Sequence, residues 1–486
     1  MVDQELRQAA NDLRAELQHV TPPPFRPKSE LGGRVLLVAA TAAVFAIALA
    51  LFTGASEQVE PADPDPEPEQ IDNEEDQNPD QNNGQEELDP DLNPELETVE
   101  AGPAVTDTQH RAASQLDRPE AGLFSLEPEF ETIIAGVTDV IAGGIATPIP
   151  GGAPSWNSDG SLLVLYETGE LEAAHVLYDG VSFERLGPLP ISPADIEEIY
   201  WDPVQANAIY FAQGDQLTRH VVNRGQPEGG VNELVQTFDG CSLSTPLSQK
   251  PISANGQQIG LRCETDDGAE WIGLDLGTGQ ATRTAATGPD APQPTASGDR
   301  FTVTDDAGTV TVLDSTLTPT GVTFQIDTSL SLVLQTTDGR DLLVTTNFNL
   351  DEDQTGSVVG YDLATGEVIP AVGEATGFPF PPGGGTNLTA SWQAPGLVVA
   401  SIAGIGDPSQ QDTLDGELLL VDFNQPEPLA YRLGHHRSHE NSEFDSYRST
   451  AWTAIDPATS RVLFSSHWGE DGVDTFVIDV SELRDP

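Results

Sequence analysis

Basic residues are scarce in this sequence. The 486 residues include 20 Lys and Arg against 79 Asp and Glu, and only Lys28 and Lys250 are lysines. Proteins bind nucleic acid largely by neutralising its phosphates with Lys and Arg, so a formal net charge of −59 argues against a nucleic-acid partner. The same charge argues against adsorption to anionic lipid.

Apolar residues are also few, at 37% against roughly 45–50% in ordinary globular chains. The deficit is greatest in stretches such as PADPDPEPEQ and NEEDQNPDQNNGQEELDP, and residues 55 to 100 hold 18 Asp and Glu but no Lys or Arg. Such a segment cannot bury enough apolar surface to offset the entropy lost on ordering. We therefore predict a disordered acidic linker over 55–118.

The rest of the chain is acidic too. From residue 119 onward there are 13 Lys and Arg and 54 Asp and Glu, so the formal charge is 13 − 54 = −41. We interpret this as a solvated acidic surface suited to a saline habitat, with many weak cation sites as the alternative.

Charge is missing altogether from residues 35–53, which read VLLVAATAAVFAIALALFT. These 19 residues match the ~20 that a helix needs to cross a membrane, so we predict a transmembrane helix over 34–54. Arg26, Lys28 and Arg34 precede it, and no basic residue follows until Arg111. The positive-inside rule then makes this a single-pass signal anchor in the cell membrane, with 1–33 cytoplasmic and the remainder extracytoplasmic. A cleaved signal peptide is the alternative.

Residues 2–20 within the cytoplasmic segment predict a short amphipathic helix. Leu6, Leu13, Leu17 and Val20 share one helical face, and Pro22 follows the pattern. This face could dock a cytoplasmic partner, self-associate or lie on the inner leaflet, or the helix could have no partner at all.

Cysteine is nearly absent, with Cys241 and Cys263 the two present. An even pair in an exported domain predicts one disulfide, since each lies in a strand-like stretch of a hairpin. Two buried thiols are the alternative.

A two-part unit recurs throughout 119–486. Its first part is a turn followed by an apolar strand, and its second part is another strand that commonly ends in aspartate before a turn. The first part occurs at 155–167, 199–213, 251–264, 294–306, 331–347, 390–403 and 451–467. The aspartates are Asp275, Asp314 and Asp362, with weaker copies at Asp179, Asp422 and Asp479, and VVNRG (221–225) stands in the remaining position. We expect these aspartates to bond turn amides.

These units resemble the WD40-like repeats of TolB-type β-propellers, whose signature is a strand, S-x-D-G and an apolar strand. Asp159 and Gly160 hold a close version, Asp338 and Gly339 a related one, while 254–256 and 456–458 depart from it. The resemblance implies an all-β fold, a β-propeller of about seven blades (six to eight), over 119–486. It says little about function, because propellers host binding, scaffolding and catalysis alike.

Two stretches are candidate metal sites. LGHHRSHENSEFDSYRSTAW and FSSHWGEDGVD place four histidines close in sequence, and imidazoles bind Zn²⁺ or Mn²⁺. This stretch is similar to the final blade of secreted propellers related to oligogalacturonate lyases, in which histidines hold a divalent metal. NFNLDEDQTG places oxygen ligands at alternate positions before a glycine, as Ca²⁺ sites do. The candidates are His435, His436, His439 and His467 for Zn²⁺ or Mn²⁺, and Asp351, Asp353 and Thr355 for Ca²⁺. In both cases we interpret the stretch as a plain polar loop, with the metal as the alternative.

The sequence contains no G-x-S-x-G, H-E-x-x-H, P-loop or Rossmann fingerprint. We therefore expect a non-catalytic extracytoplasmic propeller that binds a ligand, a protein or a wall polymer. One alternative is a metal-dependent carbohydrate-active enzyme that uses the histidine loop. Another is a transmembrane sensor that signals through residues 2–20.

Overall fold

The computed structural model describes most of the chain beyond residue 103. Within that part the regular structure is β-strand, apart from short 3₁₀ turns η1 (Pro150–Gly152), η2 (Pro227–Gly229) and η4 (Glu374–Thr376). The predicted cytoplasmic helix and membrane span lie outside it, and none of the helices within it has the length and apolarity to cross a bilayer. The described residues are 104–140, 143–169, 173–245, 251–326, 331–347, 357–378, 386–403, 413–438, 450–469 and 471–481.

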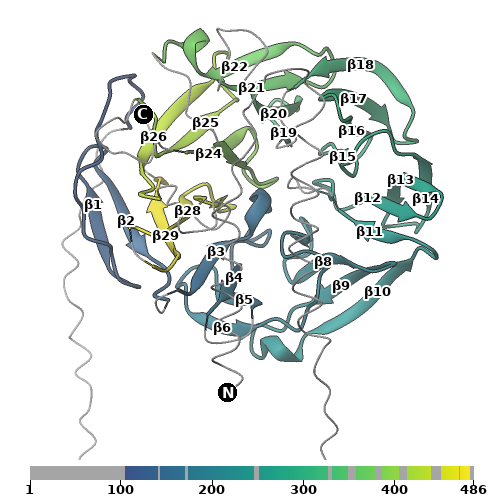
Figure 1. Cartoon of the computed structure of the whole chain (residues 1–486), viewed down its shortest axis with the longest axis horizontal. Coiled ribbons are helices and arrows are strands. Elements are labelled where there is room, and N and C mark those ends of the chain that lie inside the picture. The colour runs from purple at the N-terminus through teal and green to yellow at the C-terminus, as the bar shows by residue number, and fades with distance from the viewer. Residues whose placement is uncertain are drawn as a thin grey trace, which may run out of the picture. The chain divides into compact units, whose positions relative to one another are not determined.

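Seven antiparallel sheets are arranged in a ring, so the domain is a seven-bladed β-propeller (Figure 1). Six of them have four strands, and in each the strands follow one another in chain order. From the inner to the outer strand, blade 1 is β3 (Ile145–Pro148), β4 (Leu162–Thr168), β5 (Ala174–Asp179) and β6 (Arg185–Pro188). Blade 2 is β7 (Ile199–Trp201), β8 (Ala208–Gln213), β9 (Gln216–Val221) and β10 (Val231–Thr237). Blade 3 is β11 (Ser242–Ser244), β12 (Gln258–Thr265), β13 (Gly268–Asp275) and β14 (Ala281–Ala285). Blade 4 is β15 (Gln293–Pro294), β16 (Arg300–Thr304), β17 (Thr309–Asp314) and β18 (Pro319–Gln325). Blade 5 is β19 (Ser331–Gln335), β20 (Asp341–Asn347), β21 (Ser357–Asp362) and β22 (Val368–Val372). Blade 6 is β23 (Thr386–Thr389), β24 (Leu397–Ile402), β25 (Glu417–Asp422) and β26 (Leu429–His435).

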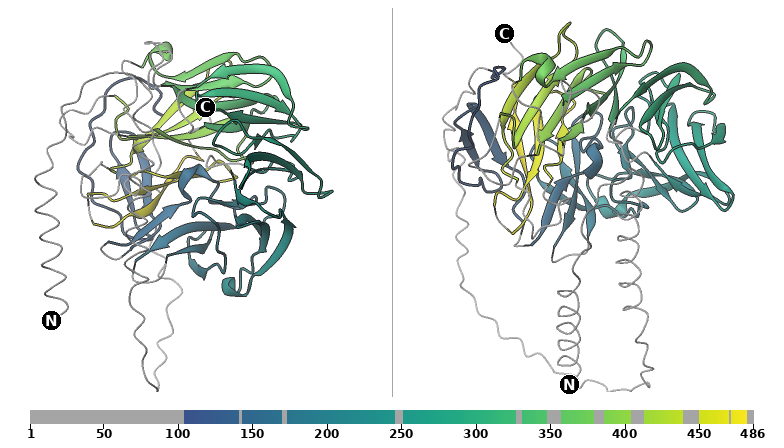
Figure 2. Two further views of the ribbon diagram at one scale, coloured as in Figure 1. Left: turned by 45° about the vertical axis from the view of Figure 1, so that its right-hand side comes forward. Right: turned by 45° about the horizontal axis from the view of Figure 1, so that its top comes forward.

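Blade 7 closes the ring with strands from both ends of the domain. Its inner strands are β27 (Thr453–Ile455), β28 (Arg461–Ser466) and β29 (Asp474–Asp479), and its outer strands are β2 (Thr132–Gly136) and β1 (Phe124–Glu127). The β2–β29 pairing joins Ile134 to Ile478, and Figure 2 shows these blue and yellow strands side by side. Because the pairing spans almost the whole domain, it holds the ring shut.

The predicted repeat is confirmed. Each of the seven turn-and-strand copies contains the second strand of one blade, and each second-part copy is the third strand. The aspartates bond turn amides as expected; for example, the Asp362 carboxylate accepts hydrogen bonds from the N–H groups of Ala364 and Thr365 at 2.8 and 2.9 Å. In blade 2 the Asn223 side chain accepts from Gly225 N–H instead, at 3.1 Å, and so replaces the missing aspartate.

Apolar side chains between neighbouring blades form the core, since each sheet packs both faces against another. One cluster extends over blades 1 to 3 and includes Tyr210, Phe211 and Leu261. Cys241 and Cys263 belong to the same cluster and are joined by a disulfide, with Cα atoms 5.1 Å apart.

The structure differs from the sequence interpretation over residues 104–118, which we had assigned to the disordered linker. These residues, hereafter the strap, lie against the outer edge of blade 6 and blade 7. Val105 pairs with Arg432 on β26, and the Trp468 indole donates a hydrogen bond to the Leu116 carbonyl at 2.9 Å. The polar composition of the strap concealed this, because its contacts are hydrogen bonds from the domain rather than buried apolar side chains.

Candidate functional site

The junction of blades 6 and 7 carries most of the unusual chemistry of the described part, beginning with Arg432. Its guanidinium is fully buried and forms two hydrogen bonds to the Glu417 carboxylate, at 2.7 and 2.6 Å. It also donates to the strap carbonyls of Asp107 and Gln109, at 3.1 and 2.6 Å, and lies 5.3 Å from the centroid of the Phe130 ring. The planar fork of Arg suits such multiple bonding, so Arg432 ties the strap to the propeller.

His435 extends the same network from the end of β26. Its Nδ1 lies 3.3 Å from Glu127 Oε1 and its Nε2 lies 3.0 Å from the carbonyl oxygen of Arg111. Glu127 is fully buried and also forms an ion pair with Arg437. Burial favours a raised pKa for Glu127, but the hydrogen bond from His435 and the charge of Arg437 outweigh it and lower the pKa.

The other candidate histidines are engaged by the protein in a different way. His436 Nε2 lies 2.8 Å from the Ile402 carbonyl oxygen, and its Nδ1 accepts a hydrogen bond from Ser438 N–H at 3.0 Å. His467 Nδ1 accepts from Gly469 N–H at 2.9 Å. A ring nitrogen that bonds the protein is not available to a metal, whereas the other nitrogen of the same ring can still be a ligand.

Both ring nitrogens of His435 and of His436 are therefore engaged by protein groups, and so is Nδ1 of His467. Within the described ranges no three His, Cys, Asp or Glu side chains converge in a way that could hold a metal ion. His439 and the predicted Ca²⁺ ligands Asp351, Asp353 and Thr355 lie outside those ranges.

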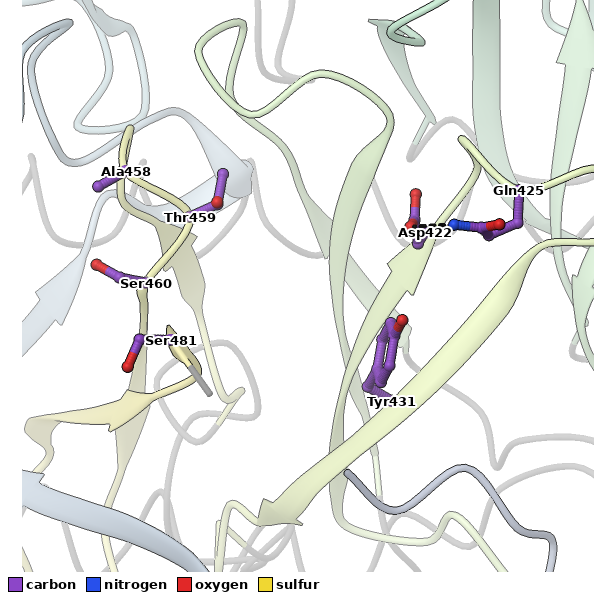
Figure 3. Close-up of a pocket in the computed structure, with 7 residues that line it drawn as sticks. All are labelled: Asp422, Gln425, Tyr431, Ala458, Thr459, Ser460 and Ser481. Carbon is purple, nitrogen blue, oxygen red and sulfur yellow. Dashed lines mark hydrogen bonds between the residues drawn. The ribbon is translucent and has the colours of Figure 1, made fainter. Parts of the chain in front are cut away.

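A polar pocket of about 400 Å³ lies at the same junction (Figure 3). Blade 6 supplies Asp422 at the end of β25, Gln425 in the following turn and Tyr431 on β26. Blade 7 supplies the other lining residues, from the β27–β28 turn and the end of β29: Ala458, Thr459, Ser460 and Ser481. The volume falls within the ~300–1,000 Å³ of small-molecule sites.

Hydrogen-bond acceptors dominate this pocket. The Asp422 side chain is 6% exposed, and its carboxylate accepts from Asn424 N–H at 2.8 Å and from the Gln425 amide at 3.4 Å. The Ser460 hydroxyl donates to Asp456 at 2.8 Å and the Ser481 hydroxyl donates to Asp479 at 2.6 Å. Each hydroxyl proton is thereby used, which leaves oxygen lone pairs for a ligand.

Thr459 has an unusual backbone conformation for a pocket residue. Its φ is 58°, and it occupies the turn position that Gly160, Gly256 and Gly339 hold in other blades with φ of 75°, 68° and 86°. A β-branched residue in the left-handed region is strained by about 1–2 kcal/mol. Directly after the 456–458 departure from the repeat signature, the pocket-lining residue Thr459 therefore replaces the glycine.

A second unusual carboxylate lies away from this junction, just before β7. Glu198 is 3% exposed; one carboxylate oxygen accepts from Thr245 N–H at 3.3 Å, and the other has no hydrogen-bond partner among the described residues. Burial, together with the charges of Asp195 and Glu197, raises the pKa of Glu198 to about 7.

Sequence reasoning brought Asp422 forward as a turn residue but missed its pocket neighbours Tyr431 and Gln425, and it missed Arg432 and Glu198 entirely. A lone arginine inside an otherwise apolar strand was the available signal for Arg432, because such a residue is seldom buried without a partner.

Comparison with solved structures supports the fold. An oligogalacturonate lyase in complex with manganese is similar to this chain with a TM-score of 0.54 and 12% identity, covering 75% of this chain and 97% of its own. An oligogalacturonate lyase from Vibrio parahaemolyticus is similar with a TM-score of 0.50 and 13% identity, covering 74% and 96%. No protein-family model and no curated protein matches the sequence. At these identities the likeness shows the propeller fold alone.

Proposed function

We propose that this chain is a membrane-anchored binding module. Residues 34–54 hold it in the cell membrane, 1–33 remain in the cytoplasm, and the propeller binds a ligand, a protein or a wall polymer outside. The uncharged run at 35–53 and the basic residues before it support the anchor and its direction.

The observation that carries the binding role is the polar pocket at the junction of blades 6 and 7. Tyr431 lines the pocket and its neighbour on β26, Arg432, holds the strap. The strap leads from the acidic linker into the closing blade. The strap is thus bonded to β26, the strand that also supplies the lining residue Tyr431.

A topology and binding experiment tests this proposal. Spheroplasts that express the full chain are treated with protease, and we expect the propeller to be digested while a tag at the N-terminus survives. The purified chain should also co-sediment with isolated cell-wall material or with an extracytoplasmic protein. A protected propeller, or an absence of co-sedimentation with either fraction, would contradict the proposal.

A metal-dependent carbohydrate-active enzyme is the second candidate, because the two similar solved structures are oligogalacturonate lyases and one contains manganese. The engaged nitrogens of His435 and His436 count against it. So does charge, since a galacturonate polyanion would be repelled by a domain with a formal charge of −41. Near-stoichiometric Zn or Mn in the purified chain, with polyuronate turnover lost in His436→Ala, would favour this enzyme over the binding module.

A sensor that signals through residues 2–20 is a third candidate, favoured by the Leu13 and Leu17 face. Pull-down of a cytoplasmic partner that is lost on Leu13→Asp would support it. An unchanged phenotype after deletion of residues 1–25 would count against it.

A further inference from the structure

We infer that the pocket between blades 6 and 7 is a saccharide site for neutral or amino sugars and selects against uronates. This inference rests on the proposed binding function and names the ligand class of its pocket. It follows from three features of the lining: the hydrogen-bond polarity, the aromatic ring and the sign of the charge.

The first feature is the hydrogen-bond polarity of the lining. A ligand that bonds the oxygen atoms of Asp422, Ser460 and Ser481 must donate to them, because the two serine hydroxyl protons already bond Asp456 and Asp479. Sugar hydroxyls and ammonium groups are donors, whereas a carboxylate group is an acceptor only. Two acceptors that face each other cannot form a hydrogen bond, so these three oxygen atoms discriminate against the carboxylate of an acidic sugar.

The aromatic ring is supplied by Tyr431, which is half-buried and packs on the apolar cluster between blades 6 and 7. Figure 3 shows its ring on the blade 6 side, facing across the pocket toward Ser460 and Ser481. A fixed aromatic face beside polar hydroxyl and carboxylate groups matches a sugar ring, which is apolar on its C–H faces and polar around its edge.

The charge of the lining determines which sugars the pocket favours. Asp422 is the charged lining residue, and no lysine or arginine lines the pocket to offset it. The surrounding field is negative as well, because Asp479 lies directly behind Ser481, whereas the charge of Asp456 behind Ser460 is offset by its ion pair with Arg461. An amino sugar is attracted by this field, a neutral sugar is indifferent to it and a uronate is repelled.

Binding of defined oligosaccharides to the full chain in detergent, measured by calorimetry, tests the inference. The probes are hexamers of glucose, N-acetylglucosamine, glucosamine and galacturonate. We expect at least one of the first three to bind at least tenfold more tightly than galacturonate. Tyr431→Ala should weaken that binding at least tenfold. Asp422→Asn should weaken it at least threefold, and because Asn keeps the acceptor for Asn424 N–H, the turn should survive.

Asp362→Asn is the matched control, since Asp362 holds the same repeat position in blade 5 and does not line the pocket. Its affinity should equal that of the wild type. Unchanged binding in both Tyr431→Ala and Asp422→Asn, tighter binding of galacturonate, or no binding of any neutral or amino probe would each overturn the inference. In those cases co-sedimentation with wall material or a protein would still uphold the broader binding role, whereas its loss would remove both.

Discussion

Blades 1 to 3 and the junction of blades 6 and 7 belong to one ring but are held together differently. The first region packs aromatic and aliphatic side chains such as Phe211 and Leu261 into one cluster that also holds the Cys241–Cys263 disulfide. The second has an apolar cluster too, but adds the buried pair of Arg432 with Glu417 and bonds to the strap.

The difference follows from how the chain reaches each region. Blades 1 to 3 are consecutive in sequence, so local hairpins bring their apolar faces together. The closing junction must unite β26, the strap and strands from both ends of the domain. The buried arginine joins β26 to the strap by directional bonds, although buried ion pairs add little net stability relative to apolar residues.

The largest effect on stability is expected from breaking the buried Arg432–Glu417 ion pair at the junction of blades 6 and 7. Arg432→Met leaves the Glu417 carboxylate buried without a counter-charge and should lower the free energy of unfolding by about 3–5 kcal/mol. Urea unfolding monitored by tryptophan fluorescence measures this, and strap proteolysis should become faster. Arg432→Met combined with Glu417→Gln should recover a substantial part of the loss.

Arg283→Met is the control for that substitution. Arg283 pairs with Glu270 on the surface of blade 3, with both side chains 40% exposed, so the loss should stay below about 1 kcal/mol. Equal losses in the two variants would mean that burial of the pair at the junction has no special importance.

Loss of the Cys241–Cys263 disulfide, which belongs to the apolar cluster of blades 1 to 3, should have the next largest effect on stability. Its cysteines are 22 residues apart, for which loop closure predicts roughly 3 kcal/mol of stabilisation. Cys241→Ala with Cys263→Ala should lower the urea midpoint accordingly while strap proteolysis stays unchanged. A strap released by the disulfide variant would show that the two regions unfold as one.

Glu198 gives the apolar region a pH dependence. Its pKa is raised to about 7, so its contribution to stability is complete below the unfolded value of 4.5 and is lost as the pH rises through 7. At 1.36 kcal/mol per pKa unit, the loss from pH 5 to pH 8 is on the order of 2 kcal/mol. Glu198→Gln should remove this part of the dependence in unfolding measured at both pH values. A parallel pH dependence in wild type and variant would exclude Glu198 as the source.

The smallest effect on stability is expected from relieving the backbone strain of Thr459 in the pocket. Thr459→Gly should raise the free energy of unfolding by about 1 kcal/mol, because glycine adopts the positive φ without steric cost. Saccharide affinity should fall in the same variant, since a lining side chain is removed. Gly339→Thr in blade 5 is the converse control and should destabilise the fold by a similar amount with no change in binding.

Much of the fold was accessible from the sequence, because hairpin signals are local. Asp275, Asp314 and Asp362 marked the third strands, and the turn before residue 162 marked the second strand of blade 1. The outer strands such as β14 and β18 were not recognised, since their exposed, polar alternation resembles loop sequence. The extent of the ordered domain was wrong at 104–118, because the bonds that order the strap come from Arg432, more than 300 residues away.

The site was less accessible for the same reason. The histidines were noticed because they are neighbours in sequence, yet the ring nitrogens of His435 and His436 bond different protein groups. Asp422 and Ser481 are far apart in sequence and line one pocket only because β25 and β29 lie in adjacent blades.

The sequence by itself determined the acidity, the repeat and a blade number of about seven, since each depends on composition or on contacts between near neighbours along the chain. Tertiary structure alone decided how the ring closes, where the strap lies and which side chains share a pocket. Those features depend on contacts between distant segments, such as the bonds from Arg432 to the strap, and no local sequence pattern reveals such partners.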